Sequence, residues 1–362
     1  MSASMGPMRP EDVPAVAELF LRVFRRGGVP SPDMLDYFEL CLFTAPGYDP
    51  ALGSVVHRGA DGAVDAALLI IPMQVRIGTR VMTGRLTSNY MTDPRRRTRG
   101  GAEMVLAIRP RYQDFCFSDS ANAVSAGHWR AIGGHNLPVQ SLDWRLLFRP
   151  AQWLLQQRGR RLPGWLRTGL GPVASGGDAL LRRVMPGLRL MPAGLGSPMA
   201  PADFIAAAPH LVERFALHPV WSADELAWLL DMAGRNRLYG DLQLRQLLDE
   251  KGEVIGASAF YARPGGMARV LNILTRPRHE RAVVADLLAH LQAMGCLGAE
   301  GLAQPFLMPA LSAHKGMVFV PRGAYCISTR HPEIVDAALR GDCYLGGLMG
   351  EDWSRLLDDF RD

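Results

Sequence analysis

Apolar residues near the N-terminus recur at intervals of three and four, which is the spacing of an amphipathic helix. This pattern predicts a helix within residues 7–26, with acids in its first turn and a Gly-Gly pair after its last. A second helix is predicted over residues 33–43. Apolar runs then predict strands over residues 54–57 and 63–76, with an Asp-Gly turn between them.

The next stretch combines a strand, a basic turn with glycines, and the start of a helix. The strand begins at residue 81 and ends at 92, the turn covers 95–101, and good helix formers fill 102–108. The first N–H groups of a helix lack partners within it, and the helix dipole favours negative charge there. Glycines let the backbone approach a phosphate closely. The sequence therefore predicts an anion-binding turn here.

Three more elements complete the first half of the chain. They are a short strand over residues 114–119, a helix over 122–133 and an alternating strand over 138–147. The order of helices and strands predicts a mixed α+β sheet with a crossover connection at the basic turn.

The second half repeats this order without a visible sequence repeat. Helices are predicted over 204–215, 224–232 and 283–294, and strands over 242–249, 253–262, 268–274 and 325–329. A segment dense in Gly and Pro separates the two halves. We therefore expect one domain over residues 1–148, a linker over 149–200 and a second domain over 201–362.

The positive charge is concentrated in the segment between the predicted domains. The chain has a net charge of +5, yet residues 151–200 hold seven Arg and one acid. We therefore expect no nucleic-acid partner, because the remaining sequence predicts no broad basic face. Two Trp-containing apolar stretches flanked by Arg leave two interpretations open. Residues 151–189 are either a linker packed against a domain or a peripheral contact with an anionic membrane.

Composition narrows the class of protein further. Of the 362 residues, 48% are hydrophobic and 21% charged, which is typical of a globular chain. The five cysteines are scattered without a CxxC pair, so we expect no disulfide framework and no metal site. The first ten residues lack the apolar core of a secretory signal. The expected location is the cytoplasm, with attachment to a membrane surface as the variant.

The basic turn resembles the cofactor loop of the GNAT acyltransferase superfamily. That loop follows the pattern Gln/Arg-x-x-Gly-x-Gly/Ala, and residues 97–102 read Arg-Thr-Arg-Gly-Gly-Ala. The family's next strand and helix often read Asn-x-x-Ala-x-x-x-Tyr-x-x-x-Gly. Asn122, Trp129 and Gly133 fall into that spacing. The resemblance covers the first predicted domain.

This resemblance implies two GNAT-like mixed-sheet domains in tandem. The second is degenerate, because its corresponding stretch, residues 275–281, contains no glycine. It also implies acetyl-CoA or another acyl-CoA as co-substrate, with the loop amides on the pyrophosphate and the preceding strand along the pantetheine arm. The expected cofactor-binding residues are Tyr90, Met91, Thr92, Arg97, Thr98, Arg99, Gly100, Gly101, Ala102 and Asn122.

Acyl transfer also needs groups that move protons and stabilise the thioester oxygen. Many family members place a Tyr as general acid where this chain has Trp129, which has no titratable proton. The candidate catalytic residues are Asp93, Asp119 and His128. Each also has a structural interpretation: Asp93 as a turn residue, Asp119 as a helix cap and His128 as a solvent-facing side chain. Backbone amides near residues 89–91 fit the role of oxyanion donors.

The predicted function is transfer of an acetyl or other acyl group from acyl-CoA to an amine or hydroxyl. The expected acceptor is a small molecule or saccharide. Two alternatives remain: a non-catalytic CoA-binding or regulatory module, and a transferase of the same tandem fold that uses aminoacyl-tRNA as donor. The second would bind tRNA with strong salt dependence. The sequence does not indicate the acyl length or the oligomeric state.

Overall fold

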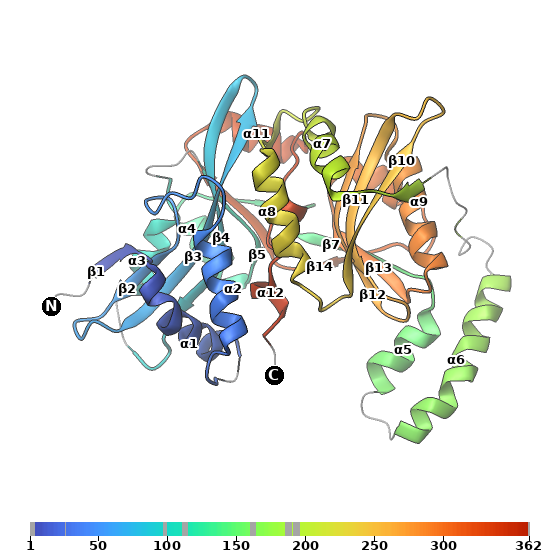
Figure 1. Cartoon of the computed structure of the whole chain (residues 1–362), viewed down its shortest axis with the longest axis horizontal. Coiled ribbons are helices and arrows are strands. Elements are labelled where there is room, and N and C mark those ends of the chain that lie inside the picture. The colour runs from blue at the N-terminus through green and yellow to red at the C-terminus, as the bar shows by residue number, and fades with distance from the viewer. Residues whose placement is uncertain are drawn as a thin grey trace. The chain divides into compact units, whose positions relative to one another are not determined.

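The computed structural model describes residues 4–25, 27–96, 100–110, 115–159, 164–184, 190 and 196–360. The chain forms two compact units, each built on its own mixed sheet (Figure 1). Unit 1 consists of Met1–Ser141, Phe215–Arg235 and Arg322–Asp362. Unit 2 consists of Leu142–Arg214 and Asn236–Pro321. The predicted α+β class, with two mixed sheets, is confirmed.

The sheet of unit 1 is antiparallel apart from one pair of strands. Its order is β1 (Ser4–Pro7), β2 (Val55–Arg58), β3 (Val64–Ile77), β4 (Arg80–Thr92), β5 (Phe115–Ala121), β15 (Ala324–Thr329) and β6 (His135–Leu137), and β9 (Leu217–Pro219) also pairs with β3. The parallel pair is β4 and β5. Because parallel neighbours need a crossover, helix α3 (Gly100–Ala107) connects them.

Helices cover this sheet and bury its apolar side chains. They are α1 (Val13–Phe24), α2 (Pro32–Phe43), α4 (Ala123–Ala131), α8 (Ala223–Gly234), α11 (Pro332–Arg340) and α12 (Arg355–Asp358). Met104 of α3 and Trp129 of α4 share one buried cluster with Leu68 and Ile70 of β3. Side-chain caps start several helices; for example, Ser31 Oγ accepts a hydrogen bond from the backbone of α2.

Unit 2 has a sheet of similar construction. Its strands lie in the order β14 (Val318–Pro321), β7 (Leu142–Leu147), β13 (Gly298–Leu302), β12 (Met267–Thr275), β11 (Val254–Ala262), β10 (Asp241–Leu248) and β8 (Gly196–Pro198). The parallel pair here is β12 and β13, connected by α9 (Glu280–Ala293). The other helices described are α5 (Pro150–Gly159), α6 (Gly164–Val184), α7 (Pro201–Val212) and α10 (Met308–Leu311).

Two strands belong to a different sheet from the one predicted. Residues 138–147 were expected to end the first domain, but Leu142–Leu147 lies between β14 and β13 in unit 2. Conversely, Ala324–Thr329 lies between β5 and β6 in unit 1. Local alternation shows that a segment is a strand but carries no information about its partner. The units therefore interleave in the sequence, whereas the predicted boundaries followed sequence order.

The segment predicted as a linker contains the helices α5 and α6. Asp178 of α6 is buried and accepts hydrogen bonds from the backbone N–H groups of Ala151 and Gln152, at the start of α5. The prediction also missed α11 and the short strands β1, β8, β9, β13 and β14. These strands are three to five residues long, which is too short for a periodic pattern.

Two further observations concern the membrane and the thiols. None of the helices in the described ranges combines the length and the hydropathy that a membrane-spanning segment needs. All five cysteines are buried free thiols.

Candidate active site

Strands β4 and β5 separate part-way along their length. They pair in parallel from Gly84 with Phe115 to Leu86 with Phe117, and within the described residues the pairing stops there although both strands continue. The hydroxyl of Thr87 donates to the carbonyl of Phe117 at 3.1 Å and closes the end of the ladder. Beyond this point the strands leave an opening in the sheet.

β4 carries a β-bulge at the start of this opening. Ile70 and Leu68 of β3 lie opposite Thr87 and Tyr90 of β4, so β4 has one residue more than β3 between these pairs. A bulge removes a residue from the ladder and redirects its backbone groups. Residues 88–89 are therefore placed to direct backbone groups out of the ladder with β3.

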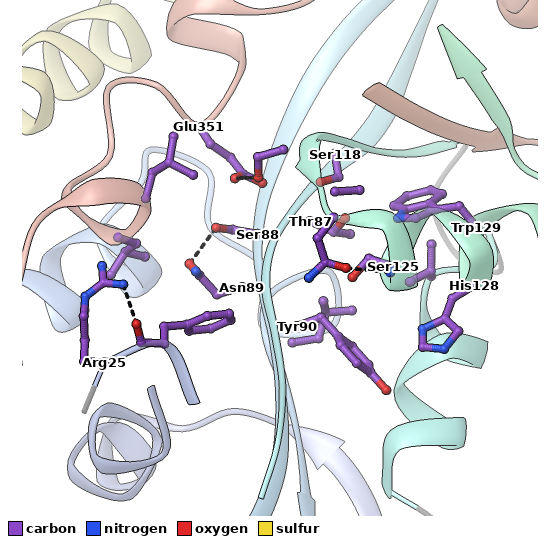
Figure 2. A pocket seen from close by; sticks show the side chains of 18 residues that line it. Arg25, Thr87, Ser88, Asn89, Tyr90, Ser118, Ser125, His128, Trp129 and Glu351 are labelled. Atoms are coloured by element: carbon purple, nitrogen blue, oxygen red, sulfur yellow. Dashed lines mark hydrogen bonds between the residues drawn. The ribbon is translucent and has the colours of Figure 1, made fainter. Parts of the chain in front are cut away.

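A pocket of about 160 Å³ lies in the opening (Figure 2). Its wall comes from α1, β3, β4, the end of α3, β5, α4 and the C-terminal segment. The lining residues are Phe24, Arg25, Leu68, Thr87, Ser88, Asn89, Tyr90, Ile108, Ser118, Ser120, Ala121, Asn122, Ser125, His128, Trp129, Glu351, Leu356 and Leu357. Figure 2 shows Glu351 and Arg25 on one side of the strands, and His128 and Trp129 on the other. Hydroxyl and amide groups dominate the polar part of this wall.

Three of the predicted site residues meet at this pocket. Tyr90, Asn122 and His128 all line it. The rings of Tyr90 and His128 lie edge to face, with centroids 5.7 Å apart. The Tyr90 hydroxyl donates to the carbonyl of Gly101 at 3.0 Å, and burial raises the pKa of Tyr90. Tyr90 thus connects the pocket to the first turn of α3.

The two predicted loop glycines allow α3 to pack closely on the sheet. A Cβ added at Gly100 would lie 2.9 Å from Cγ of His57, and one at Gly101 would lie 3.0 Å from the Tyr90 hydroxyl. The His57 ring is itself held by Asp65, with Nδ1 and Oδ1 2.5 Å apart. Packing therefore favours glycine strongly at position 100 and leaves little room for a side chain at position 101.

The other predicted cofactor residues have different surroundings. Met91 is buried in the core, Thr92 is half-buried and Ala102 is exposed. Arg97, Thr98 and Arg99 lie outside the described residues. The structure therefore places the start of α3 but not the basic part of the loop.

Asp93, a predicted catalytic candidate, has contacts typical of a turn residue. One carboxylate oxygen accepts from the guanidinium of Arg22 at 2.6 Å, and the other accepts from the backbone N–H of Arg95 at 2.9 Å. The side chain is buried and is not part of the pocket wall.

Asp119, the second candidate, is not part of the pocket wall. Its neighbours Ser118 and Ser120 line the pocket. β5 carries a β-bulge here, because two residues, 119 and 120, lie opposite the single residue Tyr325 of β15. Asp119 is fully buried, and its Oδ2 accepts a hydrogen bond from the backbone N–H of Glu351 at 3.2 Å. Its observed contact is therefore with the C-terminal segment. Asn122, rather than Asp119, caps α4.

Glu351 is a pocket residue that sequence reasoning missed. Its side chain is only 2% exposed, and its Oε2 accepts a short hydrogen bond from the Ser120 hydroxyl. Oε1 has no hydrogen-bond partner in the described part of the chain. Burial, and then the charge of Asp119, raise the pKa of Glu351 well above its ordinary value. Glu351 lies in a C-terminal segment without periodic secondary structure, so no pattern in the sequence indicates that its side chain is buried in a pocket wall.

Two arginines hold this C-terminal segment in place. Arg322 and Asp352 form a bidentate pair with both N–O distances at 3.1 Å. Arg25 donates to the backbone carbonyls of Asp359 and Phe360 at 2.6 and 3.2 Å. These contacts hold the residues that follow Glu351 in the sequence, Asp352 directly after it and Asp359 and Phe360 further on. Among the described residues, no group of three or more His, Cys, Asp or Glu is arranged to hold a metal ion.

Comparison with known proteins gives the fold a name. No protein-family profile and no curated protein matches the sequence. A solved structure from Enterococcus faecalis, described as a conserved protein of unknown function and probable N-acyltransferase, matches with a TM-score of 0.59 and 10% identity, over 91% of this chain and 72% of that one. The other matching structures include GCN5-related N-acetyltransferases, the proteins that define the GNAT fold. The chain has a GNAT fold.

Further structures support this assignment of the fold. A GCN5-related N-acetyltransferase from Anabaena variabilis has a TM-score of 0.57 at 10% identity, over 90% of this chain and 72% of that one. An N-myristoyltransferase from Saccharomyces cerevisiae with bound myristoyl-CoA has a TM-score of 0.50 at 10% identity, over 91% and 79%. At such low identity the GNAT likeness concerns the fold alone. The GNAT resemblance predicted from the basic turn is confirmed at that level.

Proposed function

We propose that unit 1 binds an acyl-CoA and transfers its acyl group to an amine or hydroxyl acceptor. The observation that carries this proposal is the opening between β4 and β5, with the first turn of α3 adjoining it through Tyr90. The unpaired strand edges offer backbone groups to an extended chain of amides such as pantetheine. The helix start offers N–H groups to a phosphate.

The donor would lie along this path in an extended form. Its pantetheine arm would follow β4 over residues 87–92, and its diphosphate would meet Gly100 and Gly101 at the start of α3. The predicted basic residues Arg97 and Arg99 would add positive charge at the diphosphate. The thioester would then reach the pocket, where only small groups fit a volume of about 160 Å³.

Two features of the pocket suit acyl transfer. Backbone N–H groups released from the ladder at the bulge, residues 88–89, are placed to stabilise the thioester oxygen as it gains negative charge. His128, on the α4 side of the pocket, is a side chain that can donate a proton to the departing thiolate. Trp129 has no such proton and is part of the buried core cluster.

Calorimetric titration of the full chain with acetyl-CoA tests this proposal, using two tryptophan substitutions on α4. Ser125 is half-buried and lines the pocket, whereas its neighbour Val124 is 68% exposed and does not. We expect saturable binding, weakened at least about tenfold by Ser125→Trp and unchanged by Val124→Trp. No binding, or equal affinity in both variants, would contradict the proposal. Gly100 is unsuitable because any side chain there meets His57.

The position of Trp129 favours a second candidate function, a CoA-binding module without catalysis. Many GNAT members are expected to have a Tyr at this position, whose hydroxyl can donate a proton. This chain has the buried indole of Trp129, which cannot act as such an acid. This candidate predicts acetyl-CoA binding with no release of CoA thiol in the presence of any amine. The first candidate predicts such release.

A further inference from the structure

The C-terminal segment brings one carboxyl group to the pocket, from the side opposite α4. Among the described residues of the pocket wall, Glu351 is the only Asp or Glu. Figure 2 shows it across the strands from His128 and Trp129. Thioester aminolysis needs one group that takes a proton from the nucleophile and one that gives a proton to the sulfur. The two sides of this pocket carry one suitable group each.

The two oxygens of Glu351 are in different situations. The Ser120 hydroxyl fixes Oε2, which leaves Oε1 buried without a partner among the described residues. A buried acceptor without a hydrogen bond is costly, and native structures nearly always satisfy it. Because Glu351 lines the pocket, an N–H donor within the pocket can satisfy Oε1.

We propose that Glu351 is the general base that takes the proton from an amine acceptor. This inference rests on the proposed acyltransferase function. The amine nitrogen attacks the thioester carbon, one N–H proton moves to Oε1 of Glu351, and the carbon–sulfur bond then breaks. The thiolate takes a proton from His128 or solvent, and Glu351 later returns its proton to solvent. The products are an amide and free CoA.

The charges around Glu351 suit this role. Burial is the main effect that disfavours its ionised form, followed by Asp119 of β5 and then Asp352 of its own segment. Arg322, before β15, and the Ser120 hydroxyl favour the ionised form. The net effect raises the pKa of Glu351, which makes it a stronger base than an exposed carboxylate. Such a site suits an amine acceptor, because the N–H groups of an amine can donate to Oε1.

Asp119 acts through Glu351 and is a positioning residue. Its Oδ2 holds the backbone N–H of Glu351, and it does not line the pocket. The sequence expectation that Asp119 takes part in proton chemistry is thus replaced here by an indirect role.

The experiment measures CoA thiol release from acetyl-CoA with a panel of primary alkylamines, for the wild type and Glu351→Gln. We expect kcat/KM to fall at least about a hundredfold in Glu351→Gln. Acetyl-CoA affinity should change less than about twofold, because the substitution keeps the shape of the side chain. Glu39→Gln, an exposed glutamate on α2, is the matched control and should behave as wild type.

A second variant separates a base from a structural residue. Ser120→Ala removes the hydroxyl that favours the ionised form of Glu351, so the acidic limb of the kcat/KM profile should move to higher pH. Formate should restore part of the activity of Glu351→Ala, because it supplies the missing carboxylate. A purely structural role predicts neither the shift nor the rescue.

The two proposals fail in different ways. A wild-type chain that neither binds acetyl-CoA nor releases thiol, with amines or with water, overturns the proposed function and this inference with it. An active wild type whose rate and pH profile persist in Glu351→Gln overturns the role of Glu351 alone. If Glu351→Gln does not fold, an unchanged pH profile in Ser120→Ala together with no formate rescue of Glu351→Ala overturns that role as well.

Discussion

The backbone N–H of Glu351 donates a hydrogen bond to Oδ2 of Asp119 at 3.2 Å, although 232 residues separate them in sequence. This contact ties the C-terminal segment to the centre of the sheet in unit 1. The residue before it, Gly350, lies so close to Asp119 that an added Cβ would fall inside contact distance of Oδ2. The segment can approach β5 only with a glycine at this position.

Gly350→Ala should therefore destabilise unit 1 and move Glu351 from the pocket. We expect a loss of about 1–3 kcal/mol, because the added methyl group meets a buried, fixed carboxylate. Urea unfolding monitored by fluorescence measures this loss. Gly234→Ala is the control, since nothing lies within 4 Å of a Cβ on that helical glycine. Equal stability of the two variants would contradict the close approach.

The Arg322–Asp352 pair should contribute strongly to the same attachment. Its side chains are 9% and 1% exposed, and removing one partner of a buried pair costs about 3–5 kcal/mol. Arg322→Ala should therefore lower the free energy of unfolding by an amount in this range. The comparison is Arg237→Ala, which breaks an exposed pair with Asp241 and should change stability by less than about 1 kcal/mol. Similar losses in both variants would argue against a buried anchor.

The stability of the protein should decline with rising pH because of Glu351. Folding raises the pKa of Glu351, whereas in the unfolded chain this pKa keeps its ordinary value of about 4.3. The folded state thus holds this proton more tightly, so stability is lost as pH rises from that ordinary value through the folded pKa. Glu351→Gln cannot ionise and should lack this decline.

Unfolding free energies of both proteins across a pH series measure the effect. Burial also raises the pKa of Glu225, to about 7. Glu225 contributes the same pH dependence of stability to the wild type and to Glu351→Gln, so its effect cancels in the difference between the two curves. Glu39→Gln should follow the wild type. Parallel curves for wild type and Glu351→Gln would show that Glu351 ionises normally.

Much of the fold could be predicted because its elements have local signals. The helix α1 follows from apolar spacing, and the strand–turn–helix stretch around Gly100 led to the GNAT resemblance. Tyr90, Asn122 and His128, three of the predicted site residues, line one pocket because they lie on elements that meet at that stretch. Their roles stay predictions.

The predictions that failed concern which segments contact one another across long distances in the sequence. The segments Leu142–Leu147 and Ala324–Thr329 were correctly predicted as strands, but each belongs to the sheet of the other unit from the one predicted. The segment that carries Glu351 follows β15, which lies beside β5 in the sheet of unit 1. Gly350 then allows this segment to approach Asp119 of β5 closely. No periodicity near residue 351 could indicate this, since the partner of a loop carboxylate is set by tertiary packing.

Helix α6 offers a test between the two interpretations left open for residues 151–189, a packed linker and a contact with an anionic membrane. Its exposed apolar residues recur at helical spacing and form one stripe: Leu170, Val173, Leu180, Leu181 and Val184. The single acid of this segment, Asp178, is buried at the start of α5. The charged residues of this segment whose exposure the structure describes, Arg158 and Arg183, are positive, which suits an anionic surface.

The membrane interpretation predicts that the full chain sediments with phosphatidylglycerol vesicles and not with phosphatidylcholine vesicles, whereas the packed-linker interpretation predicts sedimentation with neither. Val173→Asp should reduce this binding several-fold, because it places a charge in the apolar stripe. Ala179→Asp adds the same charge on another face of α6 and should have a smaller effect. No sedimentation, or equal reduction by both variants, would leave the packed-linker interpretation.

The proposed function requires that the opening between β4 and β5 holds the donor. Amide hydrogen exchange of the full chain, with and without acetyl-CoA, reports which backbone groups become protected when the donor binds. We expect slower exchange over residues 87–92 of β4 and at the start of α3, with little change in unit 2. Protection confined to unit 2, or unchanged exchange at saturating acetyl-CoA, would contradict this placement of the donor.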